Sequence, residues 1–236
     1  MSQSLAKLID LALLHPTMTD AEMRAGCEKA KKLGVASVCI KPYAVKLAAE
    51  LLRGSDVAIG TVIGFPHGSN APEIKAAEAK LACEQGATEL DMVVNVGKVI
   101  GEDWDYVARD IQAVLDIARK HKAILKVIFE NDFLPRDELK IKLCEICSRL
   151  GVDFVKTSTG FGFVKQPDGN YNYKGATEAD VALMRKHTPP SVGIKAAGGV
   201  RTQAEGLRMQ ELGCTRLGTS APEPIIGGGK SSGAGY

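Results

Sequence analysis

The sequence contains no long block of like charge and no apolar run of the length needed to cross a bilayer. Its net charge is only +2 over 236 residues, which indicates neither a nucleic-acid nor a membrane partner. Lys/Arg-rich patches with interleaved aromatic residues, which are typical of nucleic-acid-binding surfaces, are also missing. The N-terminal stretch lacks the small-residue cleavage site of a signal peptide, so we expect a cytoplasmic protein.

Motifs for metal binding are equally scarce. The six cysteines are scattered, and without an export signal they are expected to be reduced thiols. Cys144 and Cys147 form a single C-x-x-C within a helical stretch, with no second pair to complete a zinc site. The four histidines show no metal-ligand spacing. Neither the cysteines nor the histidines therefore form a recognisable metal-binding motif.

The sequence does contain a regular alternation of short apolar runs with longer amphipathic ones. The short runs are rich in Val and Ile and nearly continuously apolar, which is typical of parallel strands covered on both faces. They span 35–40, 57–63, 88–94, 123–129, 153–158, 192–196 and 215–220. The helical stretches span 20–32, 44–53, 72–85, 103–121, 136–150, 177–187 and 202–212. An eighth strand could lie at 9–14, although this segment could equally be the tail of a short N-terminal helix.

Eight βα units in a chain of this length predict an α/β fold, a TIM (β/α)8 barrel. We expect residues 1–220 to form a single catalytic barrel domain and residues 221–236 to form a flexible Gly/Ser-rich tail. The rival fold is a doubly wound open sheet. That fold usually carries a G-x-G-x-x-G turn after its first strand, and the sequence has none.

Charged residues stand on several of these apolar strands. Lys156 ends VDFVK, Lys195 ends VGIK, and Asp91 lies within TELDMVV. Catalytic groups of barrels lie at the carboxyl ends of the strands. Two buried lysines disfavour each other's charge, so the pKa of at least one is lowered, and a neutral amine can form a Schiff base. With a carboxylate to move protons, the three residues predict iminium catalysis on an aldehyde or ketone.

Other polar residues have blander interpretations. Lys126, in AILKVIF, is interpreted as a rim residue whose ammonium group reaches water. Asp91 taken alone could be a structural ion-pair partner. Cys39, in VASVCI, is either a core residue or part of the pocket wall, and His67, in the loop GFPHGS, is a candidate substrate contact.

Small residues follow both strand-end lysines, in KTSTGFG and KAAGGV. Backbone N–H groups at such turns bind phosphate, and barrels often place a phosphate between their last two βα loops. Those loops hold Gly198, Gly199 and Ser220. Each glycine signal alone also fits a tight turn. Beside the lysines, they predict a phosphorylated carbonyl substrate.

Five motifs together resemble the deoxyribose-phosphate aldolases, a family of class I aldolases on a TIM barrel. They are VKTSTGF, GIKAAGGVRT, TVIGFPHG, ELDMVVNVG and SVCIKP, and the similarity runs from about Ile9 to Ser220. The resemblance implies reversible cleavage of 2-deoxy-D-ribose 5-phosphate to D-glyceraldehyde 3-phosphate and acetaldehyde through a lysine Schiff base, in deoxyribonucleotide or deoxynucleoside catabolism. It also implies no metal or other cofactor. We expect a homodimer or another homo-oligomer.

The resemblance assigns roles residue by residue. Lys156 would be the Schiff-base lysine, Lys195 would lower its pKa and help move protons, and Asp91 would complete the proton relay. The residues expected to bind substrate are Asp10, Cys39, Thr159, Gly160, Gly198, Gly199 and Ser220.

The sequence also departs from the family pattern. Leu11, Ala12 and His15 replace polar or charged residues near the first strand, and Ala221 stands where a second serine is common. The loop GFVKQPDGNYNYKGAT is longer than the compact form of many members, and is either an active-site flap or a surface hairpin. Some members carry a C-terminal tyrosine that enters the active site. Tyr236 is placed for that role, although an exposed chain end explains it too.

Two rival functions stay open. The first is a Schiff-base aldolase for a different phosphorylated sugar. The second is a barrel that binds a sugar phosphate without chemistry, for which a pair of buried amines would have no use.

Overall fold

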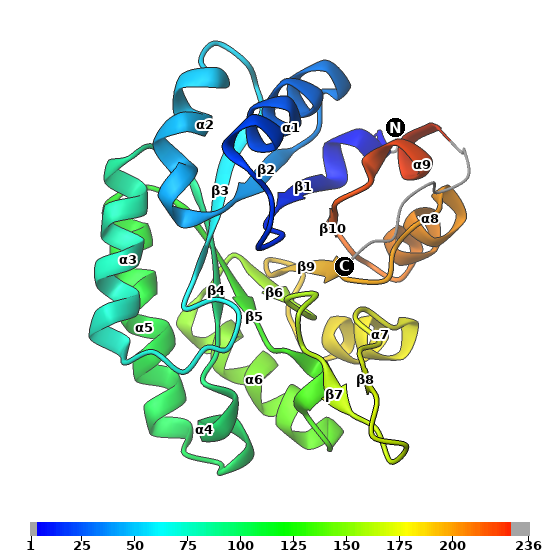
Figure 1. Ribbon diagram of the computed structural model, residues 1–236. Coiled ribbons are helices and arrows are strands. Elements are labelled where there is room, and N and C mark those ends of the chain that lie inside the picture. The colour runs from blue at the N-terminus through cyan, green and yellow to red at the C-terminus, as the bar shows by residue number, and fades with distance from the viewer. Residues whose placement is uncertain (1–3, 228–236) are drawn as a thin grey trace.

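The structure, a computed structural model, describes residues 4–227. Eight parallel strands close into a barrel in the order β1-β10-β9-β6-β5-β4-β3-β2, which confirms the predicted TIM barrel (Figure 1). The strands are β1 (Ile9–Leu13), β2 (Ser37–Ile40), β3 (Ala58–Ile63), β4 (Glu89–Val93), β5 (Ile124–Ile128), β6 (Phe154–Lys156), β9 (Gly193–Ala197) and β10 (Arg216–Thr219). Residues 9–13 are a strand and not a helix tail, because the 3-10 turn η1 (Leu5–Leu8) ends before them.

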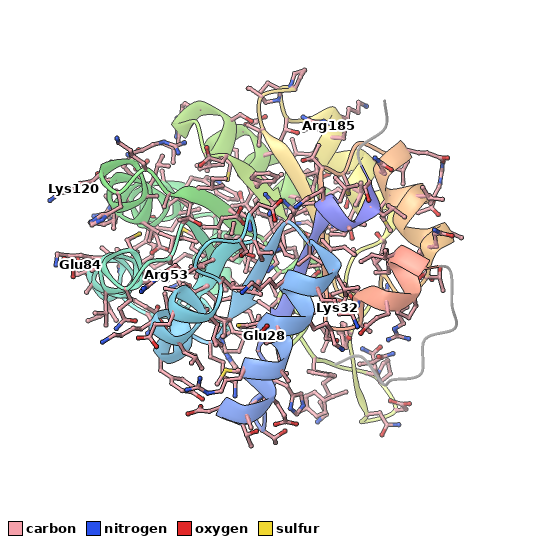
Figure 2. The ribbon with its side chains drawn as sticks, turned by 90° about the horizontal axis from the view of Figure 1, so that it is seen from above. Glu28, Lys32, Arg53, Glu84, Lys120 and Arg185 are labelled. Carbon is pink, nitrogen blue, oxygen red and sulfur yellow. The ribbon has the colours of Figure 1, made fainter. Side chains whose placement is uncertain are left out.

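Helices surround this barrel. The longer ones are α1 (Asp20–Leu33), α2 (Val45–Leu51), α3 (Pro72–Glu84), α5 (Trp104–Lys120), α6 (Asp137–Leu150), α7 (Glu178–Lys186) and α8 (Gln203–Glu211). Their outer faces carry exposed charged side chains, such as Glu28, Lys32, Glu84 and Lys120. Figure 2 shows Glu84 and Lys120 at the outer edge of the molecule. Within residues 4–227, no helix is both long and apolar enough to span a membrane.

Local sequence signals set where helices begin and end. Helix α1 opens with a capping box, in which the Thr19 side chain accepts a hydrogen bond from the Glu22 N–H and the Glu22 carboxylate accepts one from the Thr19 N–H. It ends at Gly34, whose φ of 61° is readily adopted only by glycine. Helix α8 opens with the same device at Thr202 and Glu205. This box fixes the first turn of α8 just after Gly199.

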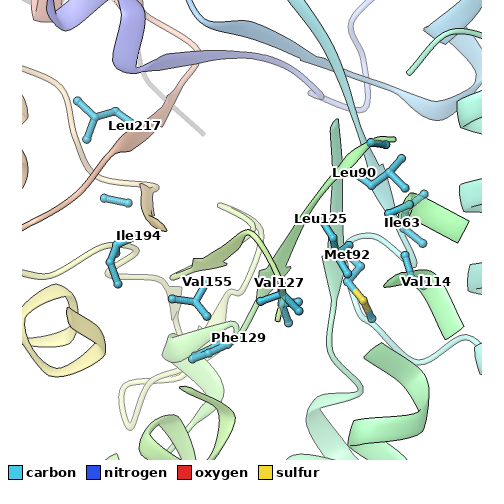
Figure 3. Close-up of a cluster of buried hydrophobic side chains, with 14 of the residues drawn as sticks. Ile63, Leu90, Met92, Val114, Leu125, Val127, Phe129, Val155, Ile194 and Leu217 are labelled. Atoms are coloured by element: carbon cyan, nitrogen blue, oxygen red, sulfur yellow. The ribbon is translucent and has the colours of Figure 1, made fainter. Parts of the chain in front are cut away.

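The hydrophobic core lies between the barrel and its helices. Successive strand residues point to opposite faces, so every second residue of a strand faces the helices. Figure 3 shows Leu90 and Met92 of β4 with Leu125 and Val127 of β5 in this layer. All four side chains are fully buried. The alternate positions of the same strands face the barrel interior and carry the charged residues.

Two helices were not predicted from the sequence. The first, the five-residue helix α4 (Val96–Ile100), precedes α5. The long loop after β6 holds an antiparallel hairpin of β7 (Val164–Lys165) and β8 (Tyr171–Asn172), which was one of the two interpretations of this loop. The second unpredicted helix is α9 (Pro222–Gly227), which lies beside the N-terminal turn in Figure 1.

Helix α9 corrects the predicted tail. Residues 222–227 are helical, and Pro222, Pro224 and Ile225 are buried, so this part is packed and not a flexible Gly/Ser linker. Ile225 of α9 packs against α8 at Gly206, where an added Cβ would lie 3.0 Å from the Ile225 side chain. Residues 228–236 lie outside the described part of the chain.

Candidate active site

Seven charged side chains fill the barrel interior and form one connected set of ion pairs. Strand alternation places them there, because all of them sit on barrel strands at inward-facing positions. They are Asp10, Glu89, Asp91, Lys126, Lys156, Lys195 and Arg216. We call this set the interior ion network.

The structure brings the three predicted catalytic residues into direct contact. Lys156 Nζ donates a hydrogen bond to Asp91 Oδ2 at 2.8 Å, and Lys195 Nζ donates to the same oxygen at 2.7 Å. The lysines are neighbours because the register of β6 and β9 pairs Lys156 with Lys195. A single carboxylate oxygen therefore joins the two amines.

The two lysines differ in pKa. Burial lowers the pKa of Lys156, the nearby charge of Lys195 lowers it further, and the attraction of Asp91 offsets only part of this. Burial alone would also lower the pKa of Lys195, but the carboxylates of Asp10 and Asp91 outweigh it and raise that pKa. Lys156 is thus the amine that loses its proton more readily.

Asp10 is the second carboxylate of the site. Its Oδ2 accepts hydrogen bonds from Lys195 at 2.5 Å and from Lys126 at 2.8 Å, and its Oδ1 accepts from Ser37 at 2.6 Å. Burial would raise the pKa of both Asp10 and Asp91, but the surrounding lysine charges outweigh it and lower both. Both groups are therefore carboxylates at neutral pH.

The interpretation of Lys126 as a rim residue is wrong. Its side chain is fully buried, and Nζ lies 2.6 Å from Glu89 and 2.8 Å from Asp10. It also lies 3.1 Å from Asp91 Oδ1, an ion-pair distance without hydrogen-bond geometry. Burial opposes the charge of Lys126, but these carboxylates raise its pKa well above the ordinary value. The ammonium group is paired inside the barrel, so it has no need to reach water.

Sequence analysis missed Glu89 and Arg216. Arg216 bridges Asp10 at 2.5 Å and Glu89 at 3.0 Å, and closes the network at the amino-terminal ends of the strands. For Glu89, the signal that could have found it is its two-residue spacing from another charged residue; the positions two residues either side of Arg216 hold Cys214 and Gly218, which carry no charge. Glu89 is two residues before Asp91 in TELDMVV, which places both on the inward face.

A cavity of about 620 Å³, measured to include its open mouth, lies at the carboxyl ends of the strands. Lys156 and Lys195 lie in its wall. The residues predicted to bind substrate line the same cavity: Asp10, Cys39, Thr159, Gly160, Gly198, Gly199 and Ser220. Ala12, Ala221 and Arg201 line it too, and Arg201 was not singled out from the sequence. Tyr236 lies outside the described residues.

Cys39 and Ala12 make one side of this cavity apolar. Cys39 packs with Leu14 and Val62, and burial raises the pKa of its thiol to about 11. The thiol therefore stays protonated at neutral pH and serves as a wall of the cavity. Ala12, one of the departures from the family pattern, packs against the same small cluster.

Thr159 lines the cavity, but its polar groups are engaged elsewhere. Its N–H donates to Glu130 Oε1 at 3.1 Å, and its hydroxyl donates a short hydrogen bond to Glu130 Oε2. Glu130, which follows β5, was not a predicted site residue. Burial raises its pKa to about 7. Glu130 thus fixes the KTSTG turn through Thr159. Gly160, which follows in this turn with a φ of 88°, lines the cavity.

Two further sequence expectations have structural outcomes. His67 is exposed and lines a separate hollow with Glu130 and Phe161, so the structure does not place it in the lysine cavity. Among residues 4–227, no group of three or more His, Cys, Asp or Glu side chains could hold a metal ion. The predicted metal independence stays a prediction, because this geometry tests no reaction.

A closed parallel barrel in which Lys156, Lys195 and Asp10 line a cavity at the carboxyl ends of the strands defines a barrel enzyme. The sequence profile of the DeoC/LacD family aldolase matches residues 4–211. The chain belongs to this family of aldolases.

Curated relatives support the same placement. The chain is 48% identical over 228 residues to the deoxyribose-phosphate aldolase of Geobacillus sp. (strain WCH70), covering 97% of both chains. It is 47% identical over 227 residues to that of Listeria monocytogenes serotype 4a (strain HCC23), covering 96% of both. The tetrameric deoxyribose phosphate aldolase of Aeropyrum pernix superimposes with a TM-score of 0.83 at 30% identity, covering 94% of this chain and 89% of the other.

Proposed function

We propose that this chain reversibly cleaves 2-deoxy-D-ribose 5-phosphate to D-glyceraldehyde 3-phosphate and acetaldehyde, with Lys156 as the Schiff-base lysine. One observation carries the proposal. Lys156 is a buried amine of lowered pKa in the cavity wall, and it shares a carboxylate oxygen with a second lysine. The substrate comes from the names of the Geobacillus and Listeria relatives, both deoxyribose-phosphate aldolases.

The reaction follows from the chemistry of a neutral amine. Lys156 Nζ adds to the C1 aldehyde of the open-chain sugar, and loss of water gives a protonated imine. Removal of the C3 hydroxyl proton lets the C2–C3 bond break, with its electron pair moving to the iminium nitrogen. Glyceraldehyde 3-phosphate leaves. The remaining enamine takes a proton at C2, and hydrolysis releases acetaldehyde and restores the amine.

The interior ion network supplies the proton transfers. Asp91 Oδ2 contacts both amines, so it can accept a proton from Lys156 and return it through Lys195. Lys195 stays cationic because Asp10 holds it at 2.5 Å. A fixed positive charge beside Lys156 favours its neutral, nucleophilic form.

The glycine turns and Arg201 form the phosphate end of the cavity. Gly198 and Gly199 have φ values of 76° and 86°, and consecutive residues of this kind turn backbone N–H groups toward an anion. Ser220 offers a hydroxyl group, and the Arg201 guanidinium adds a charge suited to phosphate. Ala221 offers no hydroxyl beside them, which favours weaker phosphate binding than a serine would give.

The proposal needs no metal or other cofactor, because the iminium nitrogen takes up the electron pair. Turnover should therefore be unchanged after treatment with EDTA, and a loss that added Zn²⁺ or Mg²⁺ restores would contradict this part. A role in deoxyribonucleotide catabolism, a cytoplasmic location and a homo-oligomeric state stay predictions.

The direct test compares two lysine variants. Lys156→Leu should abolish cleavage of 2-deoxyribose 5-phosphate with the fold intact by circular dichroism, and Lys120→Leu, on the exposed end of α5, should not (Figure 2). A panel of phosphorylated aldoses and ketoses separates this substrate from other sugar phosphates. Activity in Lys156→Leu would contradict the assignment of Lys156 as the Schiff-base lysine. A higher kcat/KM on another sugar phosphate would show that 2-deoxyribose 5-phosphate is not the preferred substrate.

A further inference from the structure

The inserted hairpin after β6 returns to the barrel along the phosphate end of the cavity, and its role there rests on the proposed function. β7 and β8 pair Val164 with Asn172 and Lys165 with Tyr171, and the chain then runs through residues 173–176 into α7. Figure 1 shows the hairpin extending outward from the barrel between β6 and α7. We call residues 173–176 the return segment.

The return segment packs directly on the glycine turn. The Ala176 N–H donates to Ala197 O at 3.1 Å and to Gly198 O at 3.0 Å. An added Cβ on Gly175 would lie 2.7 Å from the Gly198 backbone, and one on Gly199 would lie 3.1 Å from Lys174 O. The two backbones are thus as close as glycine allows, and the return segment forms one wall of the turn.

Asp132 holds the other side of the return segment. Its Oδ1 accepts a hydrogen bond from the Lys174 N–H at 2.6 Å, and its Oδ2 accepts one from the Gly175 N–H at 3.0 Å. Asp132 lies in the 3-10 turn η3 (Asn131–Phe133), two residues after Glu130. The loop after β5 therefore anchors both turns of the phosphate end. Glu130 holds the first turn by its hydrogen bonds with Thr159, and Asp132 holds the second by its hydrogen bonds with the return segment.

The strength of phosphate binding depends on how well the N–H donors are held in place before the ligand arrives. A charged carboxylate accepting two backbone N–H bonds is a strong anchor. Without it, the return segment can move away from the turn. Phosphate affinity would then fall and the chemical step would not change, because Lys156 and the interior ion network are held by other residues.

We propose that Asp132 is a positioning residue for phosphate recognition, which it carries out by holding the return segment of the inserted hairpin against Gly198 and Gly199. Asp132 does not touch the substrate. The hairpin is accordingly a specificity element, and the preference for a phosphorylated over an unphosphorylated sugar depends on it.

The test compares Asp132→Ala with Asp168→Ala. Asp168 caps the tip of the same hairpin through Asn170 and does not contact the return segment or the glycine turn, so it is a matched control. For Asp132→Ala, KM for 2-deoxyribose 5-phosphate should rise roughly tenfold with kcat little changed, since charge-assisted bonds are lost. With unphosphorylated 2-deoxyribose, kcat/KM should not change. Asp132→Asn, which keeps one acceptor oxygen, should give a smaller rise.

Equal losses on both sugars, or an unchanged KM for the phosphorylated one, would overturn the proposal. Inorganic phosphate affinity, measured by calorimetry, provides a readout without turnover. The affinity should fall by a similar factor in Asp132→Ala and stay unchanged in Asp168→Ala. Phosphate affinity could fall in Asp132→Ala and not in Asp168→Ala while the wild-type chain cleaves no deoxyribose phosphate. The proposed substrate would then be wrong, and the positioning role of Asp132 would stand. If phosphate affinity is equal in all variants, the positioning role fails whatever the substrate.

Discussion

Lys195 differs from Lys156 by its second carboxylate partner. Asp10 and Asp91 both bind Lys195, whereas the hydrogen-bonded carboxylate of Lys156 is Asp91 alone. This single extra contact accounts for opposite pKa shifts in two lysines that pair across adjacent strands. The residues by themselves predicted only that at least one of the two lysines has a lowered pKa, and it was the family resemblance that assigned the neutral amine to Lys156.

Removing the charge of Lys195 should therefore change how activity depends on pH. In Lys195→Met, the positive charge beside Lys156 is gone and Asp91 Oδ2 keeps Lys156 as its hydrogen-bonded partner, so the pKa of Lys156 rises and a higher pH is needed to make the neutral amine. The acidic limb of the kcat/KM profile should move upward by about 1 to 3 pH units, alongside a loss of rate. Lys195→Arg, which keeps the charge, should leave the limb in place. An unmoved limb in the Met variant would show that Lys195 does not set the pKa of Lys156.

Glu130 is a second residue whose environment predicts a pH dependence. Burial raises its pKa from an ordinary value of 4.5 to about 7, so the folded protein holds it protonated over a range in which the unfolded chain ionises it. Protonated Glu130 makes a contribution to stability that is fully present below the pKa of glutamate in the unfolded chain. This contribution is lost as pH rises through about 7, the pKa of Glu130 in the folded protein. The free energy of unfolding should thus fall by about 2 kcal/mol between pH 4.5 and 7 from this group.

Urea unfolding of the wild type and Glu130→Gln across this pH range measures that contribution. The amide cannot ionise, so the variant should lack this part of the decline, and the free energy of unfolding of the wild type should fall relative to that of the variant as pH rises. Parallel curves would mean that Glu130 ionises with the same pKa in both states.

At the scale of elements, the predictable parts of the fold are those with strong local signals. The capping box at Thr19 and the glycine at 34 define α1 to within a residue of its predicted end. Apolar runs defined the strands in the same way. Helix α4 has only five residues, and each hairpin strand has two, which is too short for periodicity to appear in the sequence.

Helix α9 was missed for a different reason. Its residues have weak intrinsic helix propensity, with prolines at 222 and 224, and a glycine-rich sequence follows them. Burial against α8 and η1 stabilises it, and that contact between distant parts of the chain is not visible in the local sequence.

This packing predicts the effect of a mutation in α9. Ile225 is fully buried, so Ile225→Ala should lower the free energy of unfolding by about 3 kcal/mol. Ile226→Ala, at the half-buried neighbour, should cost less. Chemical denaturation of the two variants checks this. Equal, negligible losses would restore the flexible tail that the sequence suggested.

At the scale of the whole molecule, the apolar core and the charged groups of the candidate site lie on opposite faces of the barrel strands. The apolar layer between strands and helices forms the core (Figure 3). The interior of the barrel holds the charged groups. The network has four basic groups, Lys126, Lys156, Lys195 and Arg216, and three acidic groups, Asp10, Glu89 and Asp91. If every group were ionised, one positive charge would be in excess. A neutral Lys156 leaves three charges of each sign.

Much of the candidate site followed from the sequence because lysines on apolar strands and glycine turns are local features. The remainder depends on closure of the barrel. Only the closed barrel brings Lys126 of β5 against Asp10 of β1, on a strand that is not its neighbour in the sheet. The sequence AILKVIF by itself gives no sign of that partner. The same holds for Asp132, whose partners lie more than forty residues further along the chain.

The measurement that tests the central claim most directly is borohydride trapping with acetaldehyde, followed by intact mass and peptide mapping. We predict one reduced two-carbon adduct per chain, on Lys156, and none in Lys156→Leu. An adduct on Lys195 or Lys126, or no adduct on the folded wild-type chain, would contradict the assignment of Lys156 as the Schiff-base lysine.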